Sequence, residues 1–340
     1  MNAMKNINTH AYEVELFKAM RPALRYDGSE PVHAWQARAR EKLMELLGLP
    51  LVPGNITMDI EYVKEFDEFV EYRFTVETEP GYHVPCHLLM PKLEGKIPLT
   101  LCLSGHGGGM HIALGRAKCE KDETALREWE HRAMGPRSIK EGRAALVIEN
   151  RSFGESSLEG YGTSCQEASK IALLMGRTVI GERVWDAMRI VDAIEKHFDN
   201  IDMTDIVCTG NSGGGTVTFY LACIDERITT AMPSCSVCTF EESIAAKRHC
   251  MCNYIPHIRR YFEMGDMGGL IAPRRLIIAA GVSDPGFYIK GSRDAYAQAK
   301  AVYDAMGIPD RIAFIEVDNG HLNYADEMWA KFYEMKNMGV

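Results

Sequence analysis

The segment Gly210-Asn211-Ser212-Gly213-Gly214 constrains the fold of this chain more than any other. It follows the apolar run DIVCTG, typical of a buried strand, and precedes TVTFYLACI, typical of a helix. A serine at such a junction lies on a sharp turn, and the flanking glycines let strand and helix approach closely. Amide groups at the helix start then favour negative charge that develops beside the serine. The alternative is a chance Gly-rich turn ahead of a helix, but the placement between a buried strand and a helix favours function, and we predict that Ser212 is a nucleophile.

Short apolar runs on both sides of this turn predict a sheet. Two strand-like segments, around Ile60 to Val63 and from Phe69 to Thr78, come first. Amphipathic stretches separate many of the later runs, and one after Gly181 predicts a helix. Such alternation favours an α/β fold with a mostly parallel central sheet and helices on both faces. The later runs are HVPCHLLMP, LTLCLSG, AALVIEN, DIVCTG, TTAMPSC, RRLIIAAG and IAFIEV.

The N-terminal part of the chain has a different pattern. Trp35, Ala39 and Leu43 recur at helical spacing, and Gly48 with Pro50 ends the run. We predict that residues 1–55 form a helical arm packed on a catalytic domain of residues 56–340. The arm also offers a contact through which the chain could form a homo-oligomer.

A serine hydroxyl is a weak nucleophile until a base removes its proton. In sites built on a strand–turn–helix serine, an acid and then a histidine follow along the chain. The downstream histidines are His249, His257 and His321. His321 lies just beyond the strand-like IAFIEV and directly after Gly320, so we predict that it is the general base. The other two are interpreted as pocket-wall or surface residues.

The acid that orients the histidine is expected in the loop after the preceding strand. Asp284 follows RRLIIAAGVS, and Pro285 and Gly286 turn the chain after it. Its carboxylate would hold the histidine tautomer and stabilise the imidazolium. Asp304 and Asp318 are the competing carboxylates, and Asp318 is better suited to capping its own loop. We predict Asp284 in this role.

A tetrahedral intermediate needs donors that are already in place. Gly213, directly after the serine, supplies one backbone N–H. LTLCLSG runs into His106-Gly107-Gly108-Gly109, a glycine turn that can supply a second. Gly108 is the first choice for this donor, with Gly107 and Gly109 as alternatives.

These motifs and their order resemble bacterial α/β-hydrolases of the acetyl xylan esterase and dienelactone hydrolase type. The resemblance covers roughly residues 60–335 and rests on SGHGGG, NRSFGES, GERVWDAMRIVDAI, GNSGGG, IAPRRLIIAAGVSDP and NGH. It implies the α/β-hydrolase fold and a serine esterase for short acyl esters, often of carbohydrates. Dienelactone hydrolases use cysteine where this chain has Ser212, and many acetyl xylan esterases have Gln where it has Gly213. The resemblance therefore supports ester hydrolysis more strongly than xylan as substrate.

Three other functions fit the same residues. A serine peptidase of the oligopeptidase type shares the triad but usually carries a large N-terminal propeller, for which the arm is too short. A uronate methyl esterase differs only in its substrate. A non-catalytic binding scaffold typically lacks a triad member, whereas this chain has a candidate for every role.

The ten cysteines are expected to be reduced, because no signal-peptide pattern precedes them. Cys235-x-x-Cys238 and Cys250-x-Cys252 contain zinc-type ligands, but their loose spacing is unlike a structural zinc motif. We expect no metal and no cofactor. We predict instead that residues 236–266 form a cap over the pocket, with Tyr254 facing the substrate. His106 and Asn211 are further predicted substrate contacts.

The overall charge bears on the partners of the chain. Its formal net charge is −9, and a basic stripe typical of nucleic-acid binding is absent from the sequence. No apolar run approaches transmembrane length. We therefore expect a cytoplasmic protein with a small-molecule or carbohydrate ester as its substrate, and neither nucleic acid nor membrane as a partner.

Overall fold

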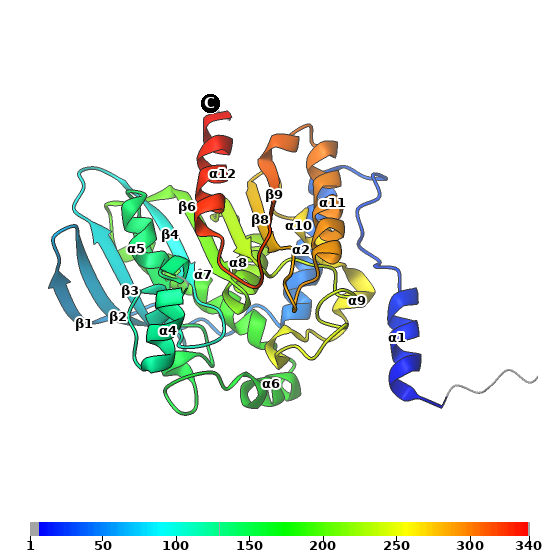
Figure 1. Ribbon diagram of the computed structural model, residues 1–340, viewed down its shortest axis with the longest axis horizontal. Coiled ribbons are helices and arrows are strands. Elements are labelled where there is room, and N and C mark those ends of the chain that lie inside the picture. The colour runs from blue at the N-terminus through cyan, green and yellow to red at the C-terminus, as the bar shows by residue number, and fades with distance from the viewer. Residues whose placement is uncertain (1–6, 129, 339–340) are drawn as a thin grey trace, which may run out of the picture.

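The computed structural model describes residues 7–128 and 130–338. One nine-stranded sheet runs through the described part, in the order β1-β2-β3-β5-β4-β6-β7-β8-β9 (Figure 1). The strands are β1 Met58–Glu65, β2 Phe69–Glu79, β3 Tyr82–Pro91, β4 Ile97–Leu103, β5 Ala144–Ile148, β6 Ile201–Asn211, β7 Thr230–Ser234, β8 Arg275–Gly281 and β9 Ile312–Val317.

The sheet is parallel from β5 through to β9, in the spatial order β5-β4-β6-β7-β8-β9. Only β1, β2 and β3 at one side pair antiparallel, and β3 joins β5 antiparallel. The carboxyl ends of the parallel strands therefore meet at one edge, where loops after β4, β6, β8 and β9 converge. The predicted α/β architecture with a mostly parallel sheet is confirmed.

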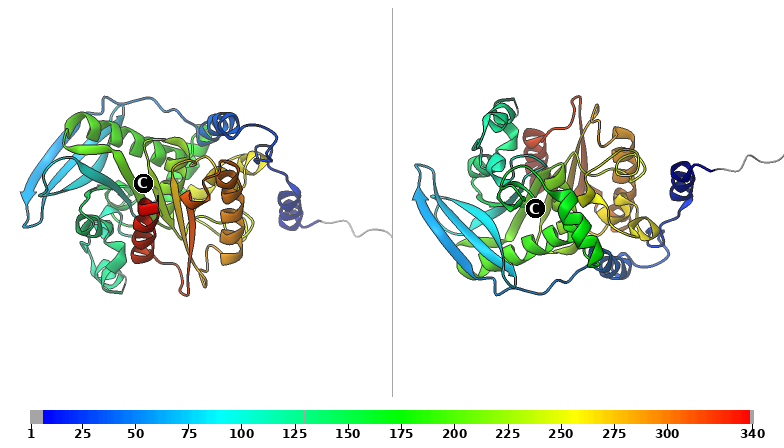
Figure 2. Two further views of the ribbon diagram at one scale, coloured as in Figure 1. Left: turned by 90° about the horizontal axis from the view of Figure 1, so that it is seen from above. Right: turned by 90° about the horizontal axis from the view of Figure 1, so that it is seen from below.

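Helices cover both faces of the sheet (Figure 2). Their bounds are α1 Thr9–Ala19, α2 Val32–Leu47, α3 Met110–Ala113, α4 Glu120–Glu128, α5 Met134–Lys140, α6 Cys165–Leu174, α7 Val179–His197, α8 Gly213–Ile224, α9 Ile258–Tyr261, α10 Met264–Gly268, α11 Ile289–Ala305 and α12 Ala325–Met338. Four 3₁₀ turns complete the described elements: η1 Glu130–Arg132, η2 Gly154–Ser156, η3 Met251–Asn253 and η4 Pro309–Arg311.

Alternate residues of the central strands supply the cores on the two faces. Ile206 and Cys208 of β6 join the large core formed with α2, α7, α8, α10 and α11. Val207, between them, joins the smaller core under α12. A third core lies under α3 and α5. This two-residue period is the expected signature of a sheet that is buried on both faces.

The two helices of the predicted arm differ in their packing. Trp35, Ala39 and Leu43 of α2 are buried in the large core, and α2 ends at Gly48 in the left-handed conformation. By contrast, α1 has no buried residue and lies at the periphery (Figures 1 and 2), where its partly buried Phe17 packs against the large core and Lys18 lies 3.3 Å from Glu241. Residues 1–6 lie outside the described residues. No helix in the described ranges is both long and apolar enough to cross a membrane.

The segment predicted to form a cap, residues 236–266, lies between β7 and β8 and contains η3, α9 and the start of α10. Its last part, α10, packs against α8 and α11 and belongs to the main core. Its middle part, around η3, packs against α6 and α7. Residues 248–253 of this segment therefore lie beside the carboxyl edge of the sheet.

Candidate active site

Ser212 lies between the end of β6 and the start of α8, with φ 54° and ψ −120°. A non-glycine residue rarely adopts this conformation, and such strain is typical of functional sites. The neighbouring glycines are required by space. A Cβ atom on Gly214 would lie 1.9 Å from the carbonyl oxygen of Leu103, and one on Gly210 would lie 2.5 Å from the backbone of Gly214. The strand, the turn and the helix are thus packed so closely that only glycine fits beside the serine.

His321 and Asp284 lie in the loops after β9 and β8. His321 Nδ1 is 2.8 Å from Asp284 Oδ2. The other carboxylate oxygen, Oδ1, accepts backbone hydrogens from Gly286 at 2.7 Å and Phe287 at 3.1 Å. Burial opposes ionisation of Asp284, but its hydrogen bonds and the nearby imidazole hold its pKa below the ordinary 3.8. The carboxylate is therefore ionised, buried and hydrogen-bonded on both oxygens.

Aromatic rings support the imidazole of His321. The Phe287 ring stacks on it, with 5.9 Å between centroids and 10° between planes. His249 meets the edge of Phe287 at 5.1 Å, and its Nε2 lies 2.9 Å from the carbonyl oxygen of Gly286. The sequence does not single out Phe287, although it follows Asp284 in the same short loop. His249 is a pocket-wall residue, as predicted.

Ser212, Gly213 and His321 line one cavity of about 300 Å³. The cap segment contributes several polar side chains to its wall. The remaining lining residues are His106, Thr216, Arg248, His249, Cys250, Asn253, Pro285, Gly286 and Phe287. A nucleophile, a histidine and groups able to form hydrogen bonds thus face one small space.

The loop after β4 lies against the serine turn. A Cβ atom on Gly105 would lie 2.7 Å from the carbonyl oxygen of Asn211. A Cβ atom on Gly213 would lie 2.8 Å from Cε1 and Nδ1 of His106. The imidazole of His106 therefore lies over the residue whose amide is predicted to bind the oxyanion, and its ring also packs on Phe153 at 4.7 Å.

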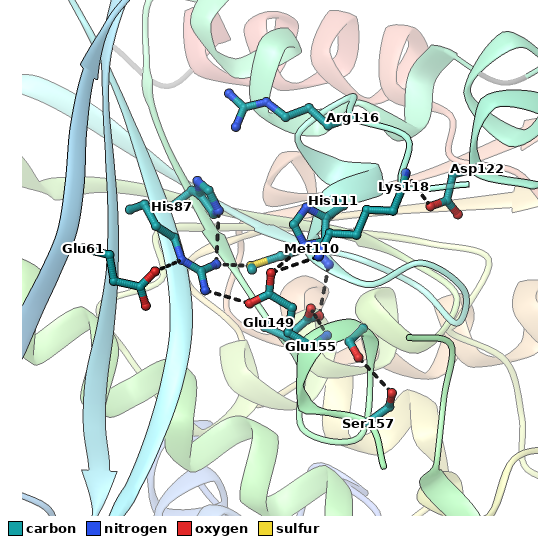
Figure 3. A network of polar contacts seen from close by, with 12 residues as sticks. Glu61, His87, Met110, His111, Arg116, Lys118, Asp122, Glu149, Glu155 and Ser157 are labelled. Atoms are coloured by element: carbon teal, nitrogen blue, oxygen red, sulfur yellow. Dashed lines mark hydrogen bonds and ion pairs between the residues drawn. The ribbon is translucent and has the colours of Figure 1, made fainter. Parts of the chain in front are cut away.

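A buried carboxylate holds this loop in place from behind. Glu149, which follows β5, accepts hydrogens from the backbone of Met110 and of Glu155, each at 3.0 Å (Figure 3). Burial raises the pKa of Glu149 to about 8. Glu155 in turn contacts His111 at 2.8 Å and Lys118 at 3.1 Å. Glu149 therefore links the glycine loop to the 150–156 loop, a role that no pattern in its sequence neighbourhood indicates.

Some predicted site residues point elsewhere. Asn211 Nδ2 donates to the carbonyl oxygen of Leu322, so this side chain braces the loop after His321. Tyr254 lines a separate cavity that also includes Phe17 of α1. Gly108 packs against Asp122 and lines a third cavity, and is not among the residues around Ser212. Which way a loop residue faces depends on neighbouring loops, which a local pattern does not reveal.

The two cysteine pairs singled out in the sequence do not come together in the structure. Cys250 and Cys252 lie with His106 and Cys165, and the four potential ligand atoms are all within 4.8 Å of one another. Cys235 lies instead beside Asp284 and His321. The sequence does not single out Cys165, at the start of α6, because no other cysteine or histidine lies near it along the chain.

The sequence of the chain matches a known protein family. A model described as the Abhydrolase family matches residues 4–314. The chain belongs to the Abhydrolase family. A Bacillus subtilis (strain 168) member of the curated proteins, named "Putative hydrolase YtaP", is 25% identical over 298 residues, covering 85% of this chain and 95% of that protein.

Solved structures share the α/β-hydrolase fold with this family member. A "putative acetyl xylan esterase" from Bacteroides fragilis NCTC 9343 superposes with a TM-score of 0.78 at 18% identity, covering 95% of this chain and 84% of the other. The methylesterase BT1017 gives 0.70 at 18% identity, with 97% and 68% covered. A glucuronoyl esterase from Solibacter usitatus gives 0.67 at 15% identity, with 93% and 97% covered. The fold implied by the sequence motifs is confirmed.

Proposed function

We propose that this protein is a serine-dependent carboxylic ester hydrolase that acts through an acyl-enzyme on short acyl esters, including esters of carbohydrates. One observation carries the proposal. A strained serine at the start of α8 shares a cavity with a histidine whose far nitrogen is held by a buried aspartate. This arrangement is the one that activates a serine hydroxyl.

Each residue has a defined part in the proposed reaction. The Ser212 oxygen attacks the ester carbonyl while His321 Nε2 takes its proton. His321 then gives that proton to the leaving alcohol, and the acyl group stays on Ser212. Water attacks the acyl-enzyme with His321 again as base, which releases the acid. Asp284 holds the proton on His321 Nδ1 and stabilises the imidazolium.

The oxyanion is stabilised by backbone amides. Gly213 is the first residue of α8, so its N–H is not used within the helix. We place the second donor in the glycine turn after His106, which lines the cavity with Ser212, whereas Gly108, the donor predicted from the sequence, lines another cavity. Donors already in place are worth about 2.7–4 kcal/mol each in serine hydrolases.

The cavity favours a small acyl group. Its volume of about 300 Å³ is at the lower end of the range for ligand pockets. Arg248, His249 and Asn253 supply polar groups in its wall, which suit the hydroxyl groups of a sugar better than an alkyl chain. Acetyl esters are therefore preferred over long-chain esters in this proposal.

A uronate ester is the second candidate. Structural neighbours include a methylesterase and glucuronoyl esterases. In that case the sugar would be the acid part of the ester, and Arg248 would contact its ring oxygens or hydroxyl groups. Both candidates use the same triad, so only the substrate separates them.

The test combines a covalent probe with a substrate panel. A fluorophosphonate should label the wild type and fail to label Ser212→Ala. If the probe labels both proteins, or neither, the assignment of Ser212 as the nucleophile is wrong. Ser236→Ala, a buried serine that does not line the cavity, is the matched control and should label like the wild type.

A panel of substrates then identifies the substrate class. It contains acetyl, butyryl, longer acyl and peptide substrates, acetylated sugars and methyl esters of uronic acids. If the probe labels Ser212 but the protein hydrolyses none of these substrates, the proposal of an ester hydrolase is contradicted.

A further inference from the structure

Four side chains with metal-ligand chemistry meet at the rim of the cavity. His106 comes from the loop after β4, Cys165 from the start of α6, and Cys250 and Cys252 from η3 and the residue before it. Their ligand atoms all lie within 4.8 Å of one another. Three separate segments of the chain therefore bring three thiols and one imidazole nitrogen to a single point.

The spacing fits one tetrahedral ion. Zn–S bonds of about 2.3 Å and Zn–N bonds of about 2.0–2.1 Å at tetrahedral angles place a sulfur and a nitrogen about 3.5 Å apart, and two sulfurs about 3.8 Å apart. The Nε2 atom of His106 lies 3.5 Å from the sulfur of Cys252 and 3.8 Å from that of Cys165. The first separation is the one expected between a nitrogen and a sulfur that share one ion, and the second is 0.3 Å longer.

A buried cation beside the cluster is a second, independent sign. Arg183 of α7 is 2% exposed, and within the described ranges the groups that act on its charge are thiols rather than carboxylates. The Nη2 atom of Arg183 donates to the sulfur of Cys165, with 3.2 Å between the two atoms. Its Nη1 atom is buried and has no hydrogen-bond partner in the described ranges. A buried charge is costly unless it is paired. Zinc with three thiolates and a neutral imidazole carries a net charge of −1, which would balance this guanidinium.

An apolar, a nucleophilic or a disulfide role fits the cluster less well. Buried cysteines often act as small apolar residues, as Cys102 and Cys208 do inside their strands, but apolar side chains do not gather around an imidazole nitrogen and a guanidinium. A second nucleophile would need contact with the substrate. Of the three thiols only Cys250 lines the cavity, whereas Cys165 and Cys252 are each 3% exposed, so a nucleophilic role leaves two of them unexplained. A disulfide would use only two of the three thiols and would leave the histidine without a role.

We propose that His106, Cys165, Cys250 and Cys252 form a Cys₃His site for a structural Zn²⁺ ion. With four protein ligands the site is closed, so the ion serves to hold the loops together and takes no part in the ester reaction. This proposal replaces the expectation of a metal-free chain drawn from the sequence. It depends on the side-chain cluster alone and holds whichever substrate the neighbouring serine attacks.

The site would couple the cap segment to the oxyanion loop. His106 lies against Gly213, and both His106 and Cys250 line the cavity with Ser212. An ion bound by these residues would fix the cap against the glycine loop and would set the position of the imidazole over the Gly213 amide. Arg183, which also donates to the carbonyl oxygen of Arg151, would orient the Cys165 thiolate from outside the coordination sphere.

Metal content tests the site directly. The untagged full-length protein, expressed with added zinc and dialysed, should contain one zinc per chain by elemental analysis. Cys250→Ser and Cys252→Ser should each lose most of it, and Cys119→Ser, a partly exposed cysteine outside the cluster, should keep it. Wild-type protein without zinc, or equal zinc in all four proteins, would overturn the proposal.

Cobalt gives a readout that does not depend on how well a variant folds. Wild-type protein grown with Co²⁺ in place of zinc should show the thiolate-to-cobalt charge-transfer absorption and the strong visible bands of a tetrahedral site. Absence of these bands would refute the ligand set. A count of titratable thiols in denatured protein, without reductant, should give all ten cysteines. A count of eight, with no metal bound, would show a disulfide in place of the ion.

Discussion

The carboxylate of Asp284 is hydrogen-bonded on both sides, to His321 Nδ1 through Oδ2 and to two backbone amides of its own loop through Oδ1. The loop after β8 thus fixes the acid, and the acid fixes the imidazole of a different loop. Because the side chain is buried, bulk water does not compete for these bonds.

Asp284→Asn should lower kcat by about 10⁴-fold, because the amide cannot hold the histidine in the required tautomer. Its carbonyl oxygen can still accept the loop amides, so the unfolding midpoint should change little. Steady-state kinetics and thermal unfolding measure the two effects. Asp318→Asn is the matched control and should keep wild-type turnover. If Asp318→Asn is instead the damaging change, the proposed acid is wrong.

Phe287→Leu should lower kcat by about 10-fold to 100-fold, because the stacked ring holds His321 in its attacking position. KM should change less than kcat, since the apolar contact with the substrate is largely kept. Phe314→Leu is the control, since its ring stacks on Tyr296 away from the cavity. Equal kinetics for the two variants would show that the stacking has no positioning role.

The parts of the site that the sequence predicts are those set by local structure. The turn around Ser212 depends on residues next to it, and the strand before His321 places that residue at the sheet edge. Asp284 could only be chosen among several carboxylates, because the pairing of its loop with that of His321 is a tertiary contact. The meeting of Cys165 with Cys252 depends on α6 packing against η3, and no spacing along the chain encodes it.

Gly214→Ala should destabilise the fold strongly, because its Cβ would lie 1.9 Å from the Leu103 carbonyl oxygen. We expect a loss of about 3 kcal/mol or more in the free energy of unfolding, at the upper end for overpacked positions. Denaturant titration measures it. Gly320→Ala, where the added methyl group meets nothing within 4 Å, is the control for that measurement. Similar stability of the two variants would mean that β4 and α8 do not pack as closely as this contact requires.

Glu149→Gln should remove a pH-dependent part of the stability. Burial raises the pKa of Glu149 from 4.5 to about 8 in the folded protein, so between these values the folded state keeps a proton that the unfolded chain releases. Its contribution to the free energy of unfolding is therefore fully present below the unfolded pKa and is lost as the pH rises through about 8. Urea unfolding of wild type and variant between about pH 5 and pH 8.5 should show a steeper decline for the wild type.

Glu155→Gln serves as the control for that pH series. Hydrogen bonding to His111 and the nearby cations hold the Glu155 pKa below 4.5 despite partial burial, so its contribution is present throughout this range and is lost only in acid. The variant should be less stable than wild type by a constant amount over the series. A wild-type decline that persists unchanged in Glu149→Gln would assign the proton to another group.

The contact between His106 and Gly213 has a consequence for how related sequences can vary. Any side chain at position 213, such as the glutamine found there in many acetyl xylan esterases, would place its Cβ within 2.8 Å of the His106 ring. A lineage can therefore keep this histidine or gain a side chain after the serine, but not both without moving the loop. We expect the two positions to have changed together in evolution, with Gly213 retained wherever the histidine and its three cysteines are retained.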